Sequence, residues 1–263
     1  MKRQMLKLGE VELELHESGE GSPLLFLHSG AGFSPDDAFV GLVDKRHRVI
    51  ASSHPGFGYS SLPDWIDSID DIAHIYLELM DQLDLRRVTL VGASIGGWIA
   101  AEMATKSPER FDKLALIGPV GVKTGGPRQL DIPDIFAHPV EALDRMRFHD
   151  PAKAKIDLTK LSEEQMRIIA RNNETLALLV WEPYMHNPKL MHRLHRLTMP
   201  VLFMRGASDG LVSAEYLDRY AKLVPGARIE TIAEAGHLPH IEQPKAFAAS
   251  LAAFLGPNPG QGA

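Results

Sequence analysis

The sequence contains no cysteine among its 263 residues, which excludes disulfide bonds, thiolate metal ligands and a cysteine nucleophile. Long hydrophobic runs are also missing, since no apolar stretch approaches the roughly 20 residues that a membrane-spanning helix needs. Residues 1–5 include two basic side chains, but Glu10, Glu12 and Glu14 interrupt the apolar segment that would have to follow in a secretory signal peptide. We therefore expect a cytoplasmic protein without membrane association.

An excess of charge of one sign is missing as well. Lys and Arg number 28 and Asp and Glu number 34, and the resulting net charge of −6 is dispersed along the chain. We expect neither a nucleic-acid partner nor a membrane-surface patch. No group of histidines and acids has a metal-ligand spacing such as H-E-x-x-H, so no metal site is expected. The sequence leaves the oligomeric state open.

Strand and helix patterns alternate along most of the chain. Residues 23–28 and 88–91 are continuous apolar runs, which are typical of strands buried on both faces. Residues 6–15 alternate as an edge hairpin does, and Ser68 begins an amphipathic helix. Residues 34–37 predict a further helix start, with serine at the N-cap and proline next. The alternation predicts an α/β fold with a mainly parallel sheet and helices on both faces.

Residues 119–196 break this pattern, because they contain helical stretches but no convincing strand. Within them, Ser162 and Gln165 fit a capping box that opens a long helix. We expect residues 119–196 to form an inserted helical cap over the carboxyl ends of the strands, where ligands bind in open α/β sheets. Residues 1–118 and 197–263 would then form one core domain.

The residues that follow the run at 88–91 carry the strongest chemical signal. Gly92-Ala93-Ser94-Ile95-Gly96 is a G-x-S-x-G pattern between a predicted strand and a predicted helix, which is the context that this motif requires. Glycines leave room for a sharp turn that lifts the serine hydroxyl above the sheet. The amino end of the following helix also favours an oxyanion there. We predict that Ser94 is a catalytic nucleophile.

The chain resembles the α/β-hydrolase superfamily over essentially its whole length. The resemblance rests on His28-Ser29-Gly30-Ala31-Gly32, Pro55-Gly56-Phe57-Gly58-Tyr59-Ser60, the motif around Ser94, Gly206-Ala207-Ser208-Asp209 and Ala235-Gly236-His237. The order serine, acid, histidine along the chain is the one expected for this fold. The pattern is specific for the superfamily and much less specific for a substrate.

A serine hydroxyl needs a base, and the base needs an orienting acid. We predict His237 as the base because it lies in a loop after the strand at 229–232, whereas His240 lies where the last helix begins and is expected to cap or pack. The strand-end position of Asp209 and the resemblance both favour Asp209 as the acid. Glu234 is the plausible substitute.

An oxyanion hole needs two N–H groups aimed at one point. The amide of Ile95, after the nucleophile, should supply one. The resemblance implies that the second comes from the loop after residues 23–28, where relatives have His-Gly-x and use the amide of x. Ser29 replaces that glycine here, so Gly30 is the first candidate and Ala31 the alternative. His28 is expected to brace this loop.

The substrate pocket is the least determined part of the site. Aromatic and apolar side chains of the predicted cap, and the residue after the base, are its candidates: Phe136, Phe148, Trp181, Tyr184 and Leu238.

The resemblance implies a serine hydrolase that needs no cofactor and cleaves a small carboxylic ester or related acyl compound through an acyl-enzyme. Carbon–carbon bond hydrolases of ring-cleavage products are an alternative, but such relatives usually carry Asn before the nucleophile and Trp after the histidine, where this chain has Ala93 and Leu238. A cofactor-free perhydrolase is a further alternative. From another class, a slow-turnover ligand receptor on the same fold also stays open. Aspartate replaces the elbow serine in haloalkane dehalogenases and epoxide hydrolases, which argues against both.

Overall fold

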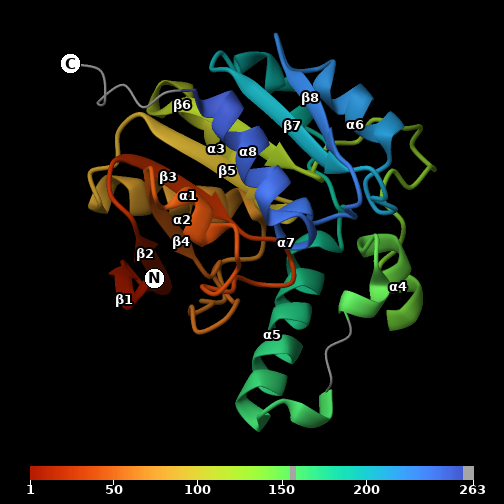
Figure 1. Cartoon of the computed structure of the whole chain (residues 1–263), viewed down its shortest axis with the longest axis horizontal. Helices are drawn as coiled ribbons and strands as arrows, with labels where there is room; N and C mark the ends of the chain where they lie inside the picture. The colour runs from red at the N-terminus through yellow and green to blue at the C-terminus, as the bar shows by residue number, and fades with distance from the viewer. Residues whose placement is uncertain (155–157, 257–263) are drawn as a thin grey trace.

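One eight-stranded sheet organises the computed structural model, which describes residues 1–154 and 158–256. The strand order is β1-β2-β4-β3-β5-β6-β7-β8. The first two strands form the antiparallel edge hairpin that the sequence predicts, and β3 to β8 run parallel to one another (Figure 1). The strand bounds are β1 Lys2–Leu8, β2 Val11–Ser18, β3 Ser22–Leu27, β4 His47–Ser52, β5 Val88–Ala93, β6 Phe111–Ile117, β7 Val201–Gly206 and β8 Arg228–Ile232.

Helices cover both faces of this sheet, as the α/β pattern predicts. The bounds of the α-helices are α1 Val40–Val43, α2 Ile69–Gln82, α3 Ile95–Lys106, α4 Val140–Arg147, α5 Glu163–Val180, α6 Ala214–Ala221, α7 Pro239–Glu242 and α8 Pro244–Leu255. Short 3-10 helices lie at Pro108–Arg110, Pro151–Ala154, Leu158–Lys160, Leu190–His192 and Leu194–Arg196. None of the helices within the described ranges is long and apolar enough to cross a bilayer.

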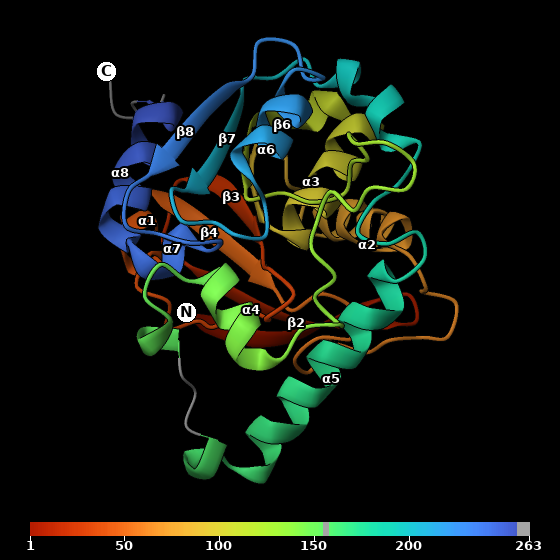
Figure 2. The ribbon, with the colours of Figure 1, turned by 90° about the vertical axis from the view of Figure 1, so that its right-hand side faces the viewer.

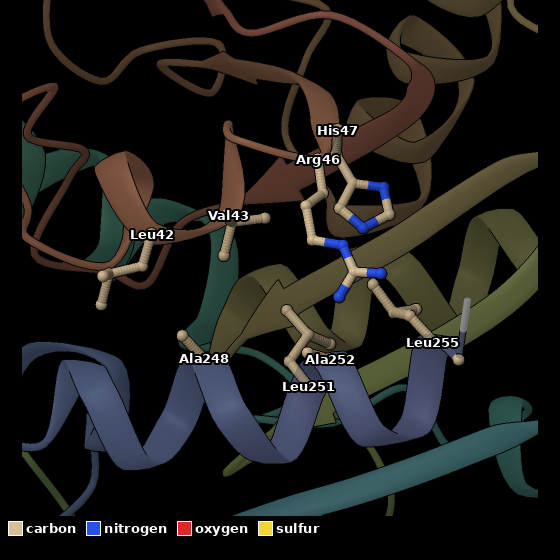
Figure 3. A pocket seen from close by; sticks show the side chains of 9 residues that line it. Leu42, Val43, Arg46, His47, Ala248, Leu251, Ala252 and Leu255 are labelled. Carbon is tan, nitrogen blue, oxygen red and sulfur yellow. The ribbon is translucent and has the colours of Figure 1, made fainter. Parts of the chain in front are cut away.

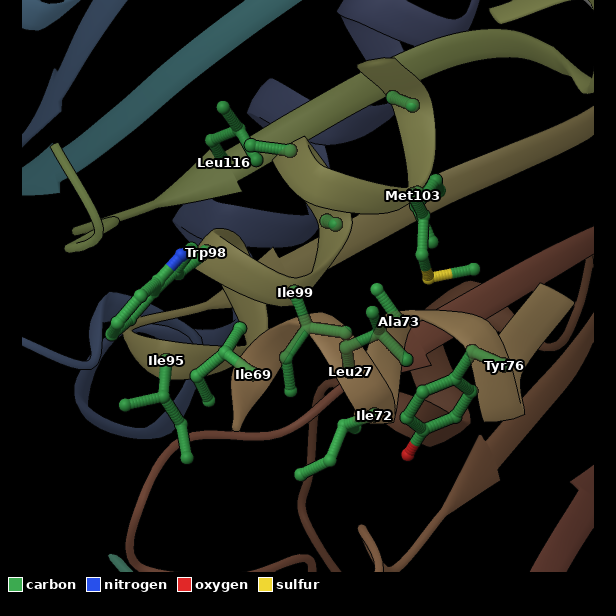
Figure 4. Packing of buried hydrophobic residues seen from close by; sticks show 14 of the residues in the cluster. Leu27, Ile69, Ile72, Ala73, Tyr76, Ile95, Trp98, Ile99, Met103 and Leu116 are labelled. Carbon is green, nitrogen blue, oxygen red and sulfur yellow. The ribbon is translucent and has the colours of Figure 1, made fainter. Parts of the chain in front are cut away.

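The continuous apolar run of β3 is explained by two cores, one on each face. Leu25 and Leu27 contribute to the core beneath α2, α3 and α6, while Leu24 and Phe26 contribute to the core beneath α1 and α8. Side chains alternate between the two faces of a strand, so a strand that is buried on both faces is apolar at every position. Figure 4 shows the first core where α2 meets α3, with Tyr76 beside the interface.

Three helix starts show how far the sequence patterns predict the helices. The capping boxes at Ser68 and Ser162 both form, and α2 and α5 begin at the next residue. The helix predicted to begin at residues 34–37 is wrong: α1 is a single turn that starts only at Val40. The amide of Asp37 donates to the carbonyl of Ser34, so this segment closes a separate turn instead of propagating a helix.

Between β6 and β7, the described residues form helices and turns, with one isolated bridge between Gly121 and His186. This bridge brings the start and the end of the segment together, because Gly121 also exchanges backbone hydrogen bonds with Met185 and Asn187. From there α5 extends away from the sheet, with α4 beside it (Figures 1 and 2).

A shallow pocket lies at the opposite edge of the sheet from the carboxyl ends of the strands. His47 and Arg46 meet the apolar side chains of α8 there, among them Leu251 and Leu255 (Figure 3). His47 begins β4 and is buried. The burial lowers the pKa of its imidazole. This pocket is remote from the predicted nucleophile, because parallel strands begin at one edge and end at the other.

Candidate active site

The strand–turn–helix context places Ser94 at the carboxyl end of β5 and at the start of α3. Its backbone has φ 55° and ψ −115°, a conformation that non-glycine residues rarely adopt. A Cβ atom at Gly92 would overlap the carbonyl of Gly96, so the turn is as crowded as the motif implies. The amide of Ser94 donates to the carbonyl of Ile117 at 2.8 Å, which ties the turn to the end of β6.

The structure brings Asp209 and His237 together at the same edge of the sheet, after β7 and β8. Nδ1 of His237 lies 3.0 Å from Oδ2 of Asp209, and both side chains are buried. The other carboxylate oxygen, Oδ1, accepts the amides of Leu211 and Val212, each at 2.9 Å. Three donors therefore hold one carboxylate in place. A carboxylate held in this way fixes the orientation of the imidazole.

Gly118 connects this pair to the turn at Ser94. It follows Ile117, whose carbonyl accepts the amide of Ser94. A Cβ atom at Gly118 would lie 3.0 Å from Nδ1 of His237 and 3.2 Å from Oδ2 of Asp209. The three predicted triad residues thus surround the end of β6.

The competing residues have other environments. Glu234 is exposed, and His237 is paired with Asp209 instead. His240 is buried, and its ring contacts those of Phe26 and Phe39 with centroids 5.6 and 5.2 Å away. Burial lowers the pKa of His240 to about 3, with a further contribution from His237. His240 therefore packs as a neutral ring, as its position in the sequence suggests.

The loop of residues 28–33, which we call the β3 loop, carries the second predicted oxyanion amide. Within the described part of the chain, the amides of Gly30 and Ile95 donate to no other protein group, so both are free to bind a ligand oxygen. The amide of Ala31 is directed at Oγ of Ser29, 3.3 Å away. This contact favours Gly30 over Ala31 as the donor.

A buried histidine pair braces the β3 loop from below. The rings of His28 and His54 stack with centroids 3.6 Å apart. Nδ1 of His28 donates to the carbonyl of Ser29, while Nε2 accepts the amide of His54. On the other side, Nδ1 of His54 lies 2.5 Å from the hydroxyl of Tyr76. Burial lowers the pKa of His28 to about 4 and holds that of His54 well below its usual value, so both rings stay neutral and keep these hydrogen bonds at neutral pH.

The predicted pocket residues fall into separate groups. Phe136 and Trp181 form a ring contact with centroids 5.7 Å apart, and Trp181 is 57% exposed. Tyr184 joins them at 6.3 Å from Phe136, with its hydroxyl fixed by backbone groups of residues 133 and 135. Phe148 follows the end of α4. Leu238 packs against the core beneath α8, away from that aromatic group.

Motifs in the sequence do not predict several of the contacts around the site. Oδ1 of Asn172 in α5 accepts the amide of Gly58 at 2.9 Å, and Nδ2 donates to the carbonyl of Ala31 at 3.3 Å. Glu242 accepts the amide of Gly236 at 2.6 Å. An acid five residues after the predicted base is the one hint that the sequence offers. Over the described ranges, no group of three or more histidines and acids is arranged to hold a metal ion.

A family model described as "alpha/beta hydrolase fold" matches residues 22–244. The similar curated proteins include a 2-hydroxymuconate semialdehyde hydrolase from Pseudomonas putida, 26% identical over 96% of this chain and 93% of the relative. A 2-hydroxy-6-oxononadienedioate/2-hydroxy-6-oxononatrienedioate hydrolase from Paraburkholderia phymatum is 29% identical over 94% and 93%. A pimeloyl-[acyl-carrier protein] methyl ester esterase from Photobacterium profundum is 27% identical over 90% and 96%.

Solved structures give the same fold. A meta-cleavage product hydrolase from Pseudomonas fluorescens has a TM-score of 0.76 at 20% identity, with 96% of this chain and 97% of that chain covered. A bromoperoxidase from Bacillus anthracis has a TM-score of 0.77 at 21% identity, with 97% and 99% covered. At these identities the likeness establishes the arrangement of the elements alone.

Proposed function

Because the chain belongs to the α/β-hydrolase fold family and is a hydrolase, we propose that it cleaves a small-molecule acyl compound through an acyl-enzyme on Ser94. The buried hydrogen bond between Asp209 and His237, beside the strained turn of Ser94, carries this proposal. A buried acid–imidazole pair next to a serine is the arrangement that activates a hydroxyl.

Each residue then has one role in two half-reactions. His237 takes the proton of the Ser94 hydroxyl as its oxygen attacks the substrate carbonyl, and passes the proton to the leaving group. The amides of Gly30 and Ile95 bind the oxyanion, while Asp209 stabilises the charged imidazole. Water then attacks the acyl-enzyme, gives its proton to His237 and releases the acid, and Ser94 regains its proton. Water is the second substrate, and these steps require no cofactor.

A carboxylic ester is the substrate class that we favour, and the activity is therefore carboxylesterase-like. Two residues support this choice, because Ala93 and Leu238 stand where ring-cleavage hydrolases usually have Asn and Trp. The esterase among the relatives is in keeping with it. We propose that residues 119–196 form the cap and that the substrate reaches Ser94 beneath it.

A carbon–carbon bond is the second candidate. Relatives at 25–29% identity over 94–96% of this chain are named as 2-hydroxymuconate semialdehyde hydrolase and as hydrolases of 2-hydroxy-6-oxo-dienoates. The same nucleophile and base would serve, since an acyl group is again transferred to water.

The test compares the two bonds on one preparation. Purified protein would be assayed on p-nitrophenyl esters of increasing acyl length and on a 2-hydroxy-6-oxo-dienoate, and in parallel labelled with a fluorophosphonate. We expect ester turnover to exceed dienoate turnover, with the adduct on Ser94 and no label in Ser94→Ala. An adduct on another residue would refute the assignment of the nucleophile. Faster dienoate turnover would favour the second candidate.

A further inference from the structure

The carboxyl end of α4 is attached directly to the two loops that carry the predicted acid and base. We call residues 207–212 the acid loop and residues 233–238 the histidine loop. The carbonyl of Arg147 accepts the amide of His237 itself, at 2.6 Å, and the carbonyl of Met146 accepts the amide of Gly210 at 2.8 Å. A Cβ atom at Gly236 would overlap the carbonyl of Arg147, so the approach leaves no room for a side chain.

Glu242 closes this junction from the other side. From the end of α7, one of its carboxylate oxygens accepts the amide of Gly236 at 2.6 Å. The same carboxylate accepts the amides of His149 at 3.0 Å and Asp150 at 3.2 Å, just beyond α4. The side chain of Glu242 therefore links the amide of Gly236, just before His237, to the residues that follow α4. Hydrogen bonds to an ionised carboxylate are stronger than those between neutral groups.

The imidazole of His149 adds a contact to the acid loop, because its Nδ1 lies 2.8 Å from Oγ of Ser208. Residues 146–149 thus touch both sides of the pair formed by Asp209 and His237. The position of the imidazole relative to its acid depends on a segment that belongs to neither loop.

We propose that Glu242 is a positioning residue for His237, acting through the peptide of Gly236 and through its grip on residues 149 and 150. The inference rests on the proposed function, because it needs His237 as the base. Glu242 itself touches no reacting atom. A carboxylate suits this task because all of its partners are N–H donors, whereas the amide NH₂ of a glutamine would face one of those donors and repel it.

The experiment compares Glu242→Ala and Glu242→Gln with wild type and with the control Glu109→Gln, which changes an exposed acid in the 3-10 helix Pro108–Arg110. The readouts are the rate of fluorophosphonate labelling at Ser94, kcat and KM on a short ester, and the downfield imidazole proton of His237 by NMR. We expect Glu242→Ala to lower the labelling rate and kcat by about ten- to a hundredfold with KM little changed, because a small misplacement of a catalytic group has this effect. Glu242→Gln should be intermediate, and the imidazole proton should move or broaden in both variants.

Each result decides between the alternatives. Wild-type labelling rates and an unchanged imidazole proton in both Glu242 variants, even with a lower unfolding temperature, would overturn the inference and leave Glu242 a structural residue only. A wild-type protein that the phosphonate does not label would overturn the proposed function instead. If Glu242→Ala does not fold, Glu242→Gln and the proton spectrum decide alone.

Discussion

His237 and His240 lie three positions apart in the chain, but their side chains have different neighbours. His237 meets a carboxylate, whereas His240 meets aromatic rings and its Nδ1 has no hydrogen-bond partner among the described residues. A base must have an orienting acid and access to the nucleophile. Of the two, His237 has the orienting acid, and it stays the predicted base.

The first prediction at this scale compares their removal. His237→Ala should lower kcat by about a thousandfold or more, because members of a triad act as a unit. His240→Phe should stay within about tenfold of wild type, since the new ring fills the same aromatic site. Steady-state ester hydrolysis measures both. The reverse ranking would show that the base is assigned to the wrong residue.

The second concerns stability in acid. Because burial lowers the pKa of His240 to about 3, the unfolded chain binds a proton at this residue between about pH 6.5 and pH 3 while the folded protein does not. The free energy of unfolding therefore falls as the pH drops through this window. His240→Phe removes that contribution, so the loss of stability between pH 7 and pH 5 should be about 2 kcal/mol smaller than in wild type.

Urea unfolding of both proteins at pH 7 and pH 5 gives these free energies. His138→Gln, at an exposed position, is the control and should behave as wild type does. An equal loss in His240→Phe and wild type would contradict a buried, neutral His240.

At the scale of elements, the sequence predicts those helices and strands whose formation depends on the pattern of their side chains. The run of β3, the amphipathic face of α2 and the capping box of α5 all lead to the elements that the structure has. The strand-end positions of Asp209 and His237 follow from the same reasoning, since parallel strands end at one edge. The failure at α1 is local, because a serine–proline–acid start fits a separate turn as well as a helix.

The junction of α4 with the catalytic loops could not be predicted in this way. Its contacts join backbone carbonyls of residues 146 and 147 to backbone amides, and every residue type supplies those carbonyls. Gly236 lies at the close approach, but glycine is common in loops of every kind and does not by itself indicate a neighbouring chain segment. When two segments contact each other through main-chain groups, the sequence contains little information about that contact.

The third prediction tests α5. Asn172 is buried and bridges Gly58 to Ala31 of the β3 loop, while the neighbouring Asn173 is exposed. Asn172→Ala should lower kcat/KM by about tenfold, because the loop that carries the oxyanion donor loses a support. Asn172→Asp keeps the acceptor for Gly58 and loses the donor to Ala31.

Ester kinetics of both variants, with Asn173→Ala as the matched control, separate the two hydrogen bonds. If Asn172→Ala and Asn173→Ala had the same kcat/KM, α5 would have no influence on the β3 loop.

At the scale of the whole molecule, two of the attachments between the core and the segment between β6 and β7 involve loops of the predicted site. The end of α4 binds the acid loop and the histidine loop, and α5 binds the β3 loop and the loop around Gly58. Thr175 and Arg171 of α5 add bonds to the carbonyls of Gly56 and Gly58. Movement of either helix would therefore be transmitted to a part of the predicted catalytic apparatus.

The two attachments differ in which groups are side chains and which are main chain, and this difference affects which substitutions they tolerate. At α4, the side chain of Glu242 accepts the amides of residues 149 and 150, and the carbonyls of residues 146 and 147 accept amides of the histidine loop and the acid loop. At α5, the side chains of Asn172, Thr175 and Arg171 bind main-chain amides and carbonyls of the core. Main-chain groups survive almost any substitution. Substitutions between β6 and β7 that keep the main-chain path should therefore keep the contacts of residues 146 and 147 with both loops, whereas the attachment at α5 is kept only where its side chains are inherited.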